Sequence, residues 1–246
     1  MSERSGSKYA RELFQSSMTK EVENKWRDYD DRYQEALEIV AQKKKKPDLL
    51  ELDRFLHQNL AELIKSRNPP HILHSELAQI MKWKLTRGKM RPLQKLVESN
   101  KAEIVISTST NAFRELEQGH IREAFDIICE LKGIGIATAS AIFSVVSPAT
   151  CPFMADEVIE SATSSGRDYT FKIFLDMNNS LQRKASELGW NAERVGRALW
   201  VCAVLGEIKE DEPIVKVTGK RNLKPPAQPL EEDPPKNNKR SRISKK

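Results

Sequence analysis

Residues 131–139 read Leu-Lys-Gly-Ile-Gly-Ile-Ala-Thr-Ala and lie between two stretches whose apolar residues recur at helical spacing. The two glycines permit a tight turn with positive φ or a close approach of the backbone to a ligand. The helix after the turn begins with unpaired N–H groups and a positive dipole end, which suit a phosphate oxygen. The segment therefore predicts a helical hairpin that grips a nucleic-acid backbone; the alternative is an ordinary turn with two glycines. The predicted binding residues are Lys132, Gly133, Ile134, Gly135 and Thr138, with Ile134 also anchoring the hairpin in the core.

A second cationic segment runs from residue 82 to residue 91, and no acidic residue interrupts positions 77–97. Gly88 and Pro92 indicate that a helix ends here and that the cations around its end sit in an accessible turn. Such a turn suits phosphate contacts, and the alternative is a solvated helix end whose cations complement the dipole. Trp83 is expected in the core because neighbouring apolar residues place it beside an apolar face. The predicted phosphate-binding cations are Lys82, Lys84, Arg87, Lys89 and Arg91.

The first segment resembles the helix-hairpin-helix of DNA repair proteins, with the pattern Leu-x-Gly-hydrophobic-Gly and Ile142 at the expected place in the helix that follows. The resemblance extends to the helix-hairpin-helix DNA glycosylase superfamily, in which a Gly/Pro-rich loop leads to an essential aspartate. Here residues 147–155, with Pro148 and Pro152, lead to Asp156. The resemblance implies that Asp156 is the catalytic carboxylate, which stabilises an oxocarbenium-like sugar or activates water as a flipped base departs. From the residues alone, Asp156 could instead be the N-cap of a helix.

Several positions depart from the pattern of that superfamily. Bifunctional members carry a Schiff-base lysine where this chain has Ala137, so the resemblance implies no lyase reaction by that route. The sequence holds no four-cysteine cluster for iron and sulfur, so no cofactor is expected beyond a monovalent cation that the hairpin could bind. The acidic Glu157 and Glu160 would disfavour DNA unless they face away. Enzymatic activity is left open, and an active protein would be a monofunctional DNA N-glycosylase.

The remaining polar residues predict no further chemistry. The four histidines show no spacing to carboxylates or cysteines that would build a metal site. Three well-separated cysteines in apolar surroundings fit buried thiols in a reducing compartment. Residues 107–110 are expected to be loop or cap material, and the lysine run 43–46 a solvated linker at a helix end. Asp48 with Glu51 resembles a capping box.

Apolar periodicity predicts an all-α fold, and the resemblance implies the helix-hairpin-helix DNA glycosylase-like type. One apolar stripe is formed by the leucines at 49, 52, 56, 60 and 63, and another by residues 121, 124, 125, 128 and 131. Further helices are predicted over residues 20–42, 75–84, 111–118, 137–146, 169–188 and 192–205. Gly119 and Gly189 fall where helices would stop. Alternating strand patterns are confined to short runs such as residues 104–106.

The predicted organisation is a loose N-terminus (1–17), one helical domain (18–208) that contains the helix-hairpin-helix (about 121–147), and a disordered Pro/Lys-rich tail (209–246). Over nearly the whole helical domain the chain also resembles an uncharacterised eukaryotic family, which implies no activity. No segment is long and apolar enough for a membrane helix. The tail ends in a basic pattern that nuclear import receptors read, formed by Lys239, Arg240, Arg242, Lys245 and Lys246; solubilising charge is the alternative.

The net charge of +6 weakly favours a polyanionic partner. We therefore expect a soluble protein of the nucleus, or else of the cytoplasm, that binds DNA through the phosphate backbone without catalysis. The first alternative is a monofunctional DNA glycosylase that uses Asp156. The second is a non-enzymatic scaffold for protein partners, which an exposed apolar groove would favour over a basic face. The sequence does not distinguish DNA from RNA, and it predicts no membrane association.

Overall fold

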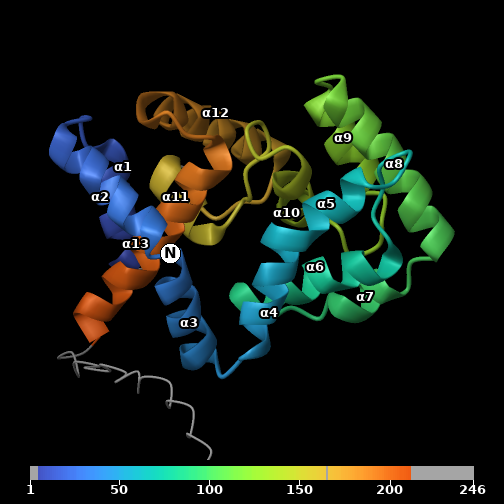
Figure 1. Cartoon of the computed structure of the whole chain (residues 1–246), viewed down its shortest axis with the longest axis horizontal. Coiled ribbons are helices and arrows are strands. Elements are labelled where there is room, and N and C mark those ends of the chain that lie inside the picture. The colour runs from blue at the N-terminus through green and yellow to red at the C-terminus, as the bar shows by residue number, and fades with distance from the viewer. Residues whose placement is uncertain (1–4, 165, 212–246) are drawn as a thin grey trace, which may run out of the picture. The chain divides into compact units, whose positions relative to one another are not determined.

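The computed structural model in Figure 1 describes residues 5–164 and 166–211, and every regular element in those two ranges is helical. In chain order the elements are α1 (Ser5–Gln15), α2 (Lys20–Asp31), α3 (Tyr33–Lys44), α4 (Asp48–Arg54), the π-helical turn η1 (Phe55–Asn59), α5 (Leu60–Lys65), α6 (His74–Arg87), α7 (Gln94–Glu98), α8 (Ala102–Glu117), α9 (Ile121–Ile128), α10 (Ile136–Val146), α11 (Asp156–Ala162), α12 (Phe171–Leu188) and α13 (Ala192–Asp211). The all-α prediction is confirmed for this part of the chain.

Two helices organise the packing. The long C-terminal helix α13 contacts α1, α2, α3, α11 and α12, whereas α10 contacts α5, α6 and α9. Figure 1 shows these two groups on either side of the segment that joins α10 to α11. Buried apolar side chains from both groups form one continuous hydrophobic core, so α10 and α11 are held in place by different neighbours.

The prediction of a loose N-terminus is wrong for α1. This helix packs against α13 and α11, with Ala10 and Leu13 buried. Ser7 Oγ donates a 2.5 Å hydrogen bond to a carboxylate oxygen of Glu160, and the Arg11 guanidinium donates to the Glu160 carbonyl oxygen. The segment is short and polar, so its order depends on partners about 150 residues away that its own composition does not indicate.

Two helical segments differ from their predicted extents. The helix predicted over residues 20–42 is broken at Arg32, which ends α2 and precedes α3 without any glycine or proline to signal the break. The strand-like run 104–106 and the predicted loop 107–110 instead lie inside α8. Val105, Ser109 and Ala112 are buried along one face of α8, so the helical period, not the alternating one, describes this segment.

The positions that are buried along the leucine stripe shift by one residue after the π-helical turn η1. Leu56 and Leu60 are buried as predicted, but Leu63 is 41% exposed and Ile64 is buried in its place. In η1 the Leu60 N–H donates to the Phe55 carbonyl, five residues back, and this wider turn shifts the phase of the residues that follow. The predicted capping box is also absent, because Pro47 is the N-cap residue of α4 and makes no side-chain cap.

The hairpin lies between α9 and α10, as predicted. Leu131 and Ile134 are buried, and Asn100 holds the turn by accepting from Lys132 N (2.9 Å) and donating to Lys132 O (3.0 Å). Gly133 has φ +81°, and a Cβ there would lie 2.9 Å from Val97 Cγ2. Gly135 is the N-cap residue of α10, with φ −123° and open space where a Cβ would be. The two glycines therefore have different roles. The turn requires Gly133, whereas Gly135 leaves open space above the start of α10.

The C-terminal boundary lies beyond its predicted position. Gly119 follows α8 and Gly189 ends α12, as predicted, but α13 continues to Asp211, past the predicted start of the tail at Lys209. The predicted disordered tail from residue 212 onward, with its nuclear-import residues, lies outside the described residues, so the nuclear assignment stays a prediction. Among the described helices, none combines the length and the apolar character that a membrane crossing requires.

The different roles of the two glycines predict different stabilities for their alanine variants. Gly133→Ala should lower the free energy of unfolding by about 2 kcal/mol, because alanine is strained at positive φ and its Cβ meets Val97. Gly135→Ala should cost less than about 1 kcal/mol, the usual scale for a changed N-cap. Urea denaturation followed by circular dichroism measures both. Equal destabilisation by the two substitutions would contradict the assigned roles.

Candidate nucleic-acid interface

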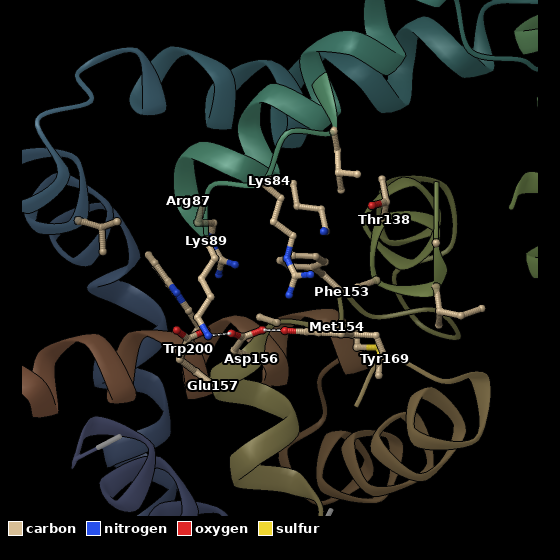
Figure 2. Close-up of a pocket in the computed structure, with 18 of the residues that line it drawn as sticks. Lys84, Arg87, Lys89, Thr138, Phe153, Met154, Asp156, Glu157, Tyr169 and Trp200 are labelled. Carbon is tan, nitrogen blue, oxygen red and sulfur yellow. Dashed lines mark hydrogen bonds and ion pairs between the residues drawn. The ribbon is translucent and has the colours of Figure 1, made fainter. Parts of the chain in front are cut away.

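Three segments that are far apart in the sequence line one pocket of about 530 Å³ (Figure 2). The end of α6 with the turn after it, the hairpin with the start of α10, and the start of α11 with the loop before it each supply a wall, and α3 and α13 complete the lining. The predicted site residues among the lining are Lys84, Arg87, Lys89, Arg91, Gly133, Gly135, Thr138 and Asp156. The hairpin, the cationic turn and the carboxylate therefore open onto the same space.

Asp156 faces this pocket from the first residue of α11. The N-cap residue of that helix is Ala155, so the alternative that Asp156 is the N-cap is wrong. Tyr169 Oη donates a 2.5 Å hydrogen bond to Asp156 Oδ1, and Lys89 Nζ lies 3.9 Å from Oδ2. Burial, followed by the hydrogen bond to Asp156, raises the pKa of Tyr169 to about 12, so the phenol remains a donor at neutral pH. The Asp156 side chain is 18% exposed and can meet a bound molecule.

Two of the predicted cations lie at the exposed edge of the pocket. Lys89 follows α6 and reaches toward Asp156, as Figure 2 shows. Arg91 Cζ lies 5.8 Å from the centre of the Tyr169 ring, close enough for a cation–π contact. Both side chains are solvent-exposed, which suits contacts with phosphate oxygens.

Arg87 and Lys82 differ from their predicted roles. Arg87 is the last residue of α6 and only 8% exposed, with its guanidinium 4.0 Å from the Trp200 ring centre and 5.2 Å from that of Phe153. It is not an accessible turn residue, because aromatic rings from two other segments enclose it. Lys82 is exposed but pairs with Asp48 at 3.1 Å and lies outside the pocket lining.

The hairpin contributes backbone more than side chains. Lys132 is exposed and Ile134 is buried, and neither lines the pocket, so Ile134 is a core anchor and not a contact residue. Thr138 N makes the first hydrogen bond of α10, to Gly135 O at 2.8 Å. The N–H groups of Ile136 and Ala137 come before this first bond and therefore have no partner within the helix.

The lysine run at the end of α3 supplies site residues, although its sequence pattern predicts a solvated linker. Lys44 Nζ donates to the carbonyl oxygens of Thr86 (3.3 Å), Arg87 and Gly88, the last residues of α6 and its cap. Lys43 also lines the pocket, and its Nζ lies 3.8 Å from a carboxylate oxygen of Glu207. The run of cations is visible in the sequence, but only the packing of α3 beside α6 brings it to the site.

The acidic residues near Asp156 have separate environments. Glu160 is buried and faces away from the pocket, pairing with Arg167 and accepting from Ser7. Glu157 lines the pocket, so one of the two acids that could disfavour a polyanion remains at the site.

A buried polar cluster supports the pocket from behind. Glu193 accepts a 2.7 Å hydrogen bond from Phe153 N and thereby holds the loop before α11. Burial raises the pKa of Glu193 to about 7, although this hydrogen bond and the charges of Arg197 and Arg87 act in the opposite direction. Burial lowers the pKa of His57 to about 4, which keeps this imidazole neutral. Within the described ranges, no group of three or more His, Cys, Asp or Glu side chains could hold a metal ion.

Comparisons with protein-family models, with curated proteins and with solved structures found no match to the chain.

The raised pKa of Glu193 predicts how stability depends on pH. Because the folded protein holds the Glu193 proton up to about pH 7 whereas the unfolded chain releases it near pH 4.5, the contribution of Glu193 to wild-type stability should fall as pH rises between these values. Glu193→Gln keeps an acceptor for Phe153 N and removes the titration. Its stability relative to wild type should increase from pH 4.5 to pH 7, by on the order of 3 kcal/mol, and then level off.

Urea denaturation of both proteins across this range measures the difference. The opposite effect of His57 cancels, because both proteins share that residue. A stability difference that is independent of pH would contradict the assignment of a raised pKa to Glu193.

Proposed function

We propose that the protein binds DNA along its phosphate backbone, with a helix-hairpin-helix DNA glycosylase-like helical domain, and that the pocket receives a nucleotide turned out of the duplex. One observation carries the proposal: the hairpin glycines, the cationic turn and Asp156 line the same pocket. Backbone N–H groups at the start of α10 and the exposed Lys89 and Arg91 would hold phosphates on either side of that nucleotide.

The charge and size of the pocket support this choice of ligand. Its lining includes six cations and three carboxylates, an excess of positive charge that attracts a polyanion. A volume of about 530 Å³ lies within the range of small-molecule sites and leaves room for one nucleotide. Tyr169 and Phe153 offer aromatic surface beside the polar groups, as sites for nucleobases do.

The same lining argues against the scaffold alternative. A docking site for a protein partner would favour an exposed apolar groove. Among the described residues, none of the exposed large apolar side chains, at positions 63, 73, 90, 96 and 104, lines this pocket. The basic edge of the pocket therefore favours a nucleic acid over an apolar protein surface.

Binding can be tested by fluorescence anisotropy with a labelled duplex across a salt series. Affinity should fall steeply with salt, because phosphate contacts release counterions. Lys89→Glu/Arg91→Glu should weaken binding at low salt about fivefold or more, which corresponds to about 1 kcal/mol for charge-assisted contacts. Gly135→Ala should also weaken binding, since its methyl group occupies the open space above the start of α10.

Lys172→Glu/Arg183→Glu is the matched control, because it makes the same change in charge at exposed positions of α12 outside the pocket lining. Equal losses in the two double variants would remove the cationic turn from the interface. Tighter binding of single-stranded RNA than of duplex DNA would redirect the proposal to RNA.

A second candidate function, glycosidic-bond hydrolysis, is favoured by the position of Asp156. Its carboxylate is partly exposed inside the pocket and is oriented by Tyr169 Oη. In this reaction the bond between the sugar C1′ and the base nitrogen breaks, and the base leaves with the bonding electron pair and takes up a proton. The carboxylate stabilises the cationic sugar, and water forms the new C1′–O bond and gives up a proton.

Asp156→Asn should abolish base release from lesion-containing oligonucleotides and leave duplex binding intact, because the amide carries no negative charge to oppose the cationic sugar. Release is measured as strands that break after treatment with hot alkali. Absence of release by the wild-type protein across a broad panel of lesions would leave the non-catalytic binding function. Equal release by both proteins would remove Asp156 from the chemistry.

A further inference from the structure

Lys84 places a primary amine inside the pocket. Its side chain leaves α6 partly buried and extends into the space shown in Figure 2. Within the part of the chain that the structure describes, the Lys84 ammonium makes neither an ion pair nor a hydrogen bond. Lys82, one residue before Trp83 on the same helix, is the opposite case: it is exposed and paired with Asp48. The two lysines are close in sequence but have different environments.

The surroundings of Lys84 lower its pKa. Burial lowers the pKa of Lys84, and the positive charge of Arg91 lowers it further, while Asp156 acts in the opposite direction. Lys89 and Arg87 also line the pocket and add positive charge around it. A lower pKa makes the proton easier to remove, and the neutral amine is the form that attacks a carbonyl carbon.

We propose that Lys84 is a nucleophile that forms an imine with the aldehyde of a ring-opened sugar held in the pocket. The inference rests on the proposed function, because an abasic site in DNA is the substrate that presents such an aldehyde between two backbone phosphates. The cationic edge and the hairpin would hold those phosphates, and the space left by the absent base would let the sugar enter. Ala137 occupies the hairpin position where bifunctional glycosylases carry their lysine, and it lines the same pocket. The amine of Lys84 enters this pocket from α6, not from the hairpin.

The step needs no additional reactant. The lone pair of Lys84 Nζ attacks the aldehyde carbon, a C–N bond forms, and the carbonyl electron pair moves to oxygen, which takes up a proton. Loss of this hydroxyl group as water, together with a proton from nitrogen, gives the imine. Overall, an amine and an aldehyde give an imine and one water, with no oxidation or reduction.

Sodium borohydride tests the proposal, because it reduces an imine to a stable amine and crosslinks the protein to the oligonucleotide. The substrate is a labelled duplex with one abasic site, and the crosslinked band is measured on a denaturing gel. Lys84→Arg keeps the positive charge but removes the amine, and it should reduce crosslinking at least tenfold. Lys82→Arg is the matched control and should crosslink as wild type does. Mass spectrometry of the wild-type adduct should locate it at Lys84.

A parallel reaction with 2-deoxyribose 5-phosphate and borohydride, without DNA, separates the inference from the proposed function. Selective addition of this sugar at Lys84 in a protein that fails to bind duplex DNA would support the nucleophile and overturn the DNA-binding function. Duplex binding with undiminished crosslinking by Lys84→Arg, or an adduct located at another residue, would overturn the nucleophile and leave DNA binding standing. Absence of any adduct with either substrate, in a protein that binds the duplex, would also overturn it.

Discussion

The buried Arg87 guanidinium joins the segments that surround the pocket. Rings from α6, from the loop before α11 and from α13 lie around it, with Trp200 closest at 4.0 Å. Its Nε is buried without a hydrogen-bond partner among the described residues, and the aromatic faces around the guanidinium offer cation–π contacts to this buried charge. Since Lys89 and Arg91 follow two and four residues later, fixing Arg87 also fixes where the exposed cations begin. Lys44, at the end of α3, holds the same end of α6 by donating to the carbonyl oxygens of Arg87 and Gly88.

Charged groups in this pocket differ in their partners and in their exposure, and that difference separates groups that stabilise the fold from groups that a ligand could reach. Arg87 is enclosed by rings, and Glu160 is paired away from the pocket, so both stabilise the fold. Lys89 and Arg91 are exposed at the edge of the pocket, where the proposed phosphate contacts would form. Lys84 and Asp156 lie between these extremes: they are partly buried, they line the cavity, and the charge of Asp156 opposes the lowering of the Lys84 pKa. Such intermediate groups are the ones whose chemistry a bound molecule can use.

Local pattern predicted much of the helical structure and the hairpin, because helix periodicity and turn-forming glycines act over a few residues. Predictions failed where distant partners decide the outcome. The α1 helix is ordered by α11 and α13, and Leu63 is exposed because the π-helical turn η1 shifts the phase of the stripe. Arg87 was assigned to the accessible turn for a similar reason: Phe153 and Trp200, which enclose it, lie more than 60 residues further along the chain.

Periodicity and composition alone predict the helical class, the glycine hairpin between two amphipathic segments, and the residue types available for phosphate contact and acid–base chemistry. Which of those residues share a pocket depends on the tertiary structure. It brought Lys43 and Lys44 from α3 to the site, left Lys82 outside it, and placed the Lys84 amine in the same cavity as Asp156. The physical reason is that charge and periodicity are local properties, whereas burial and the neighbours of a side chain depend on how helices distant in the chain pack together.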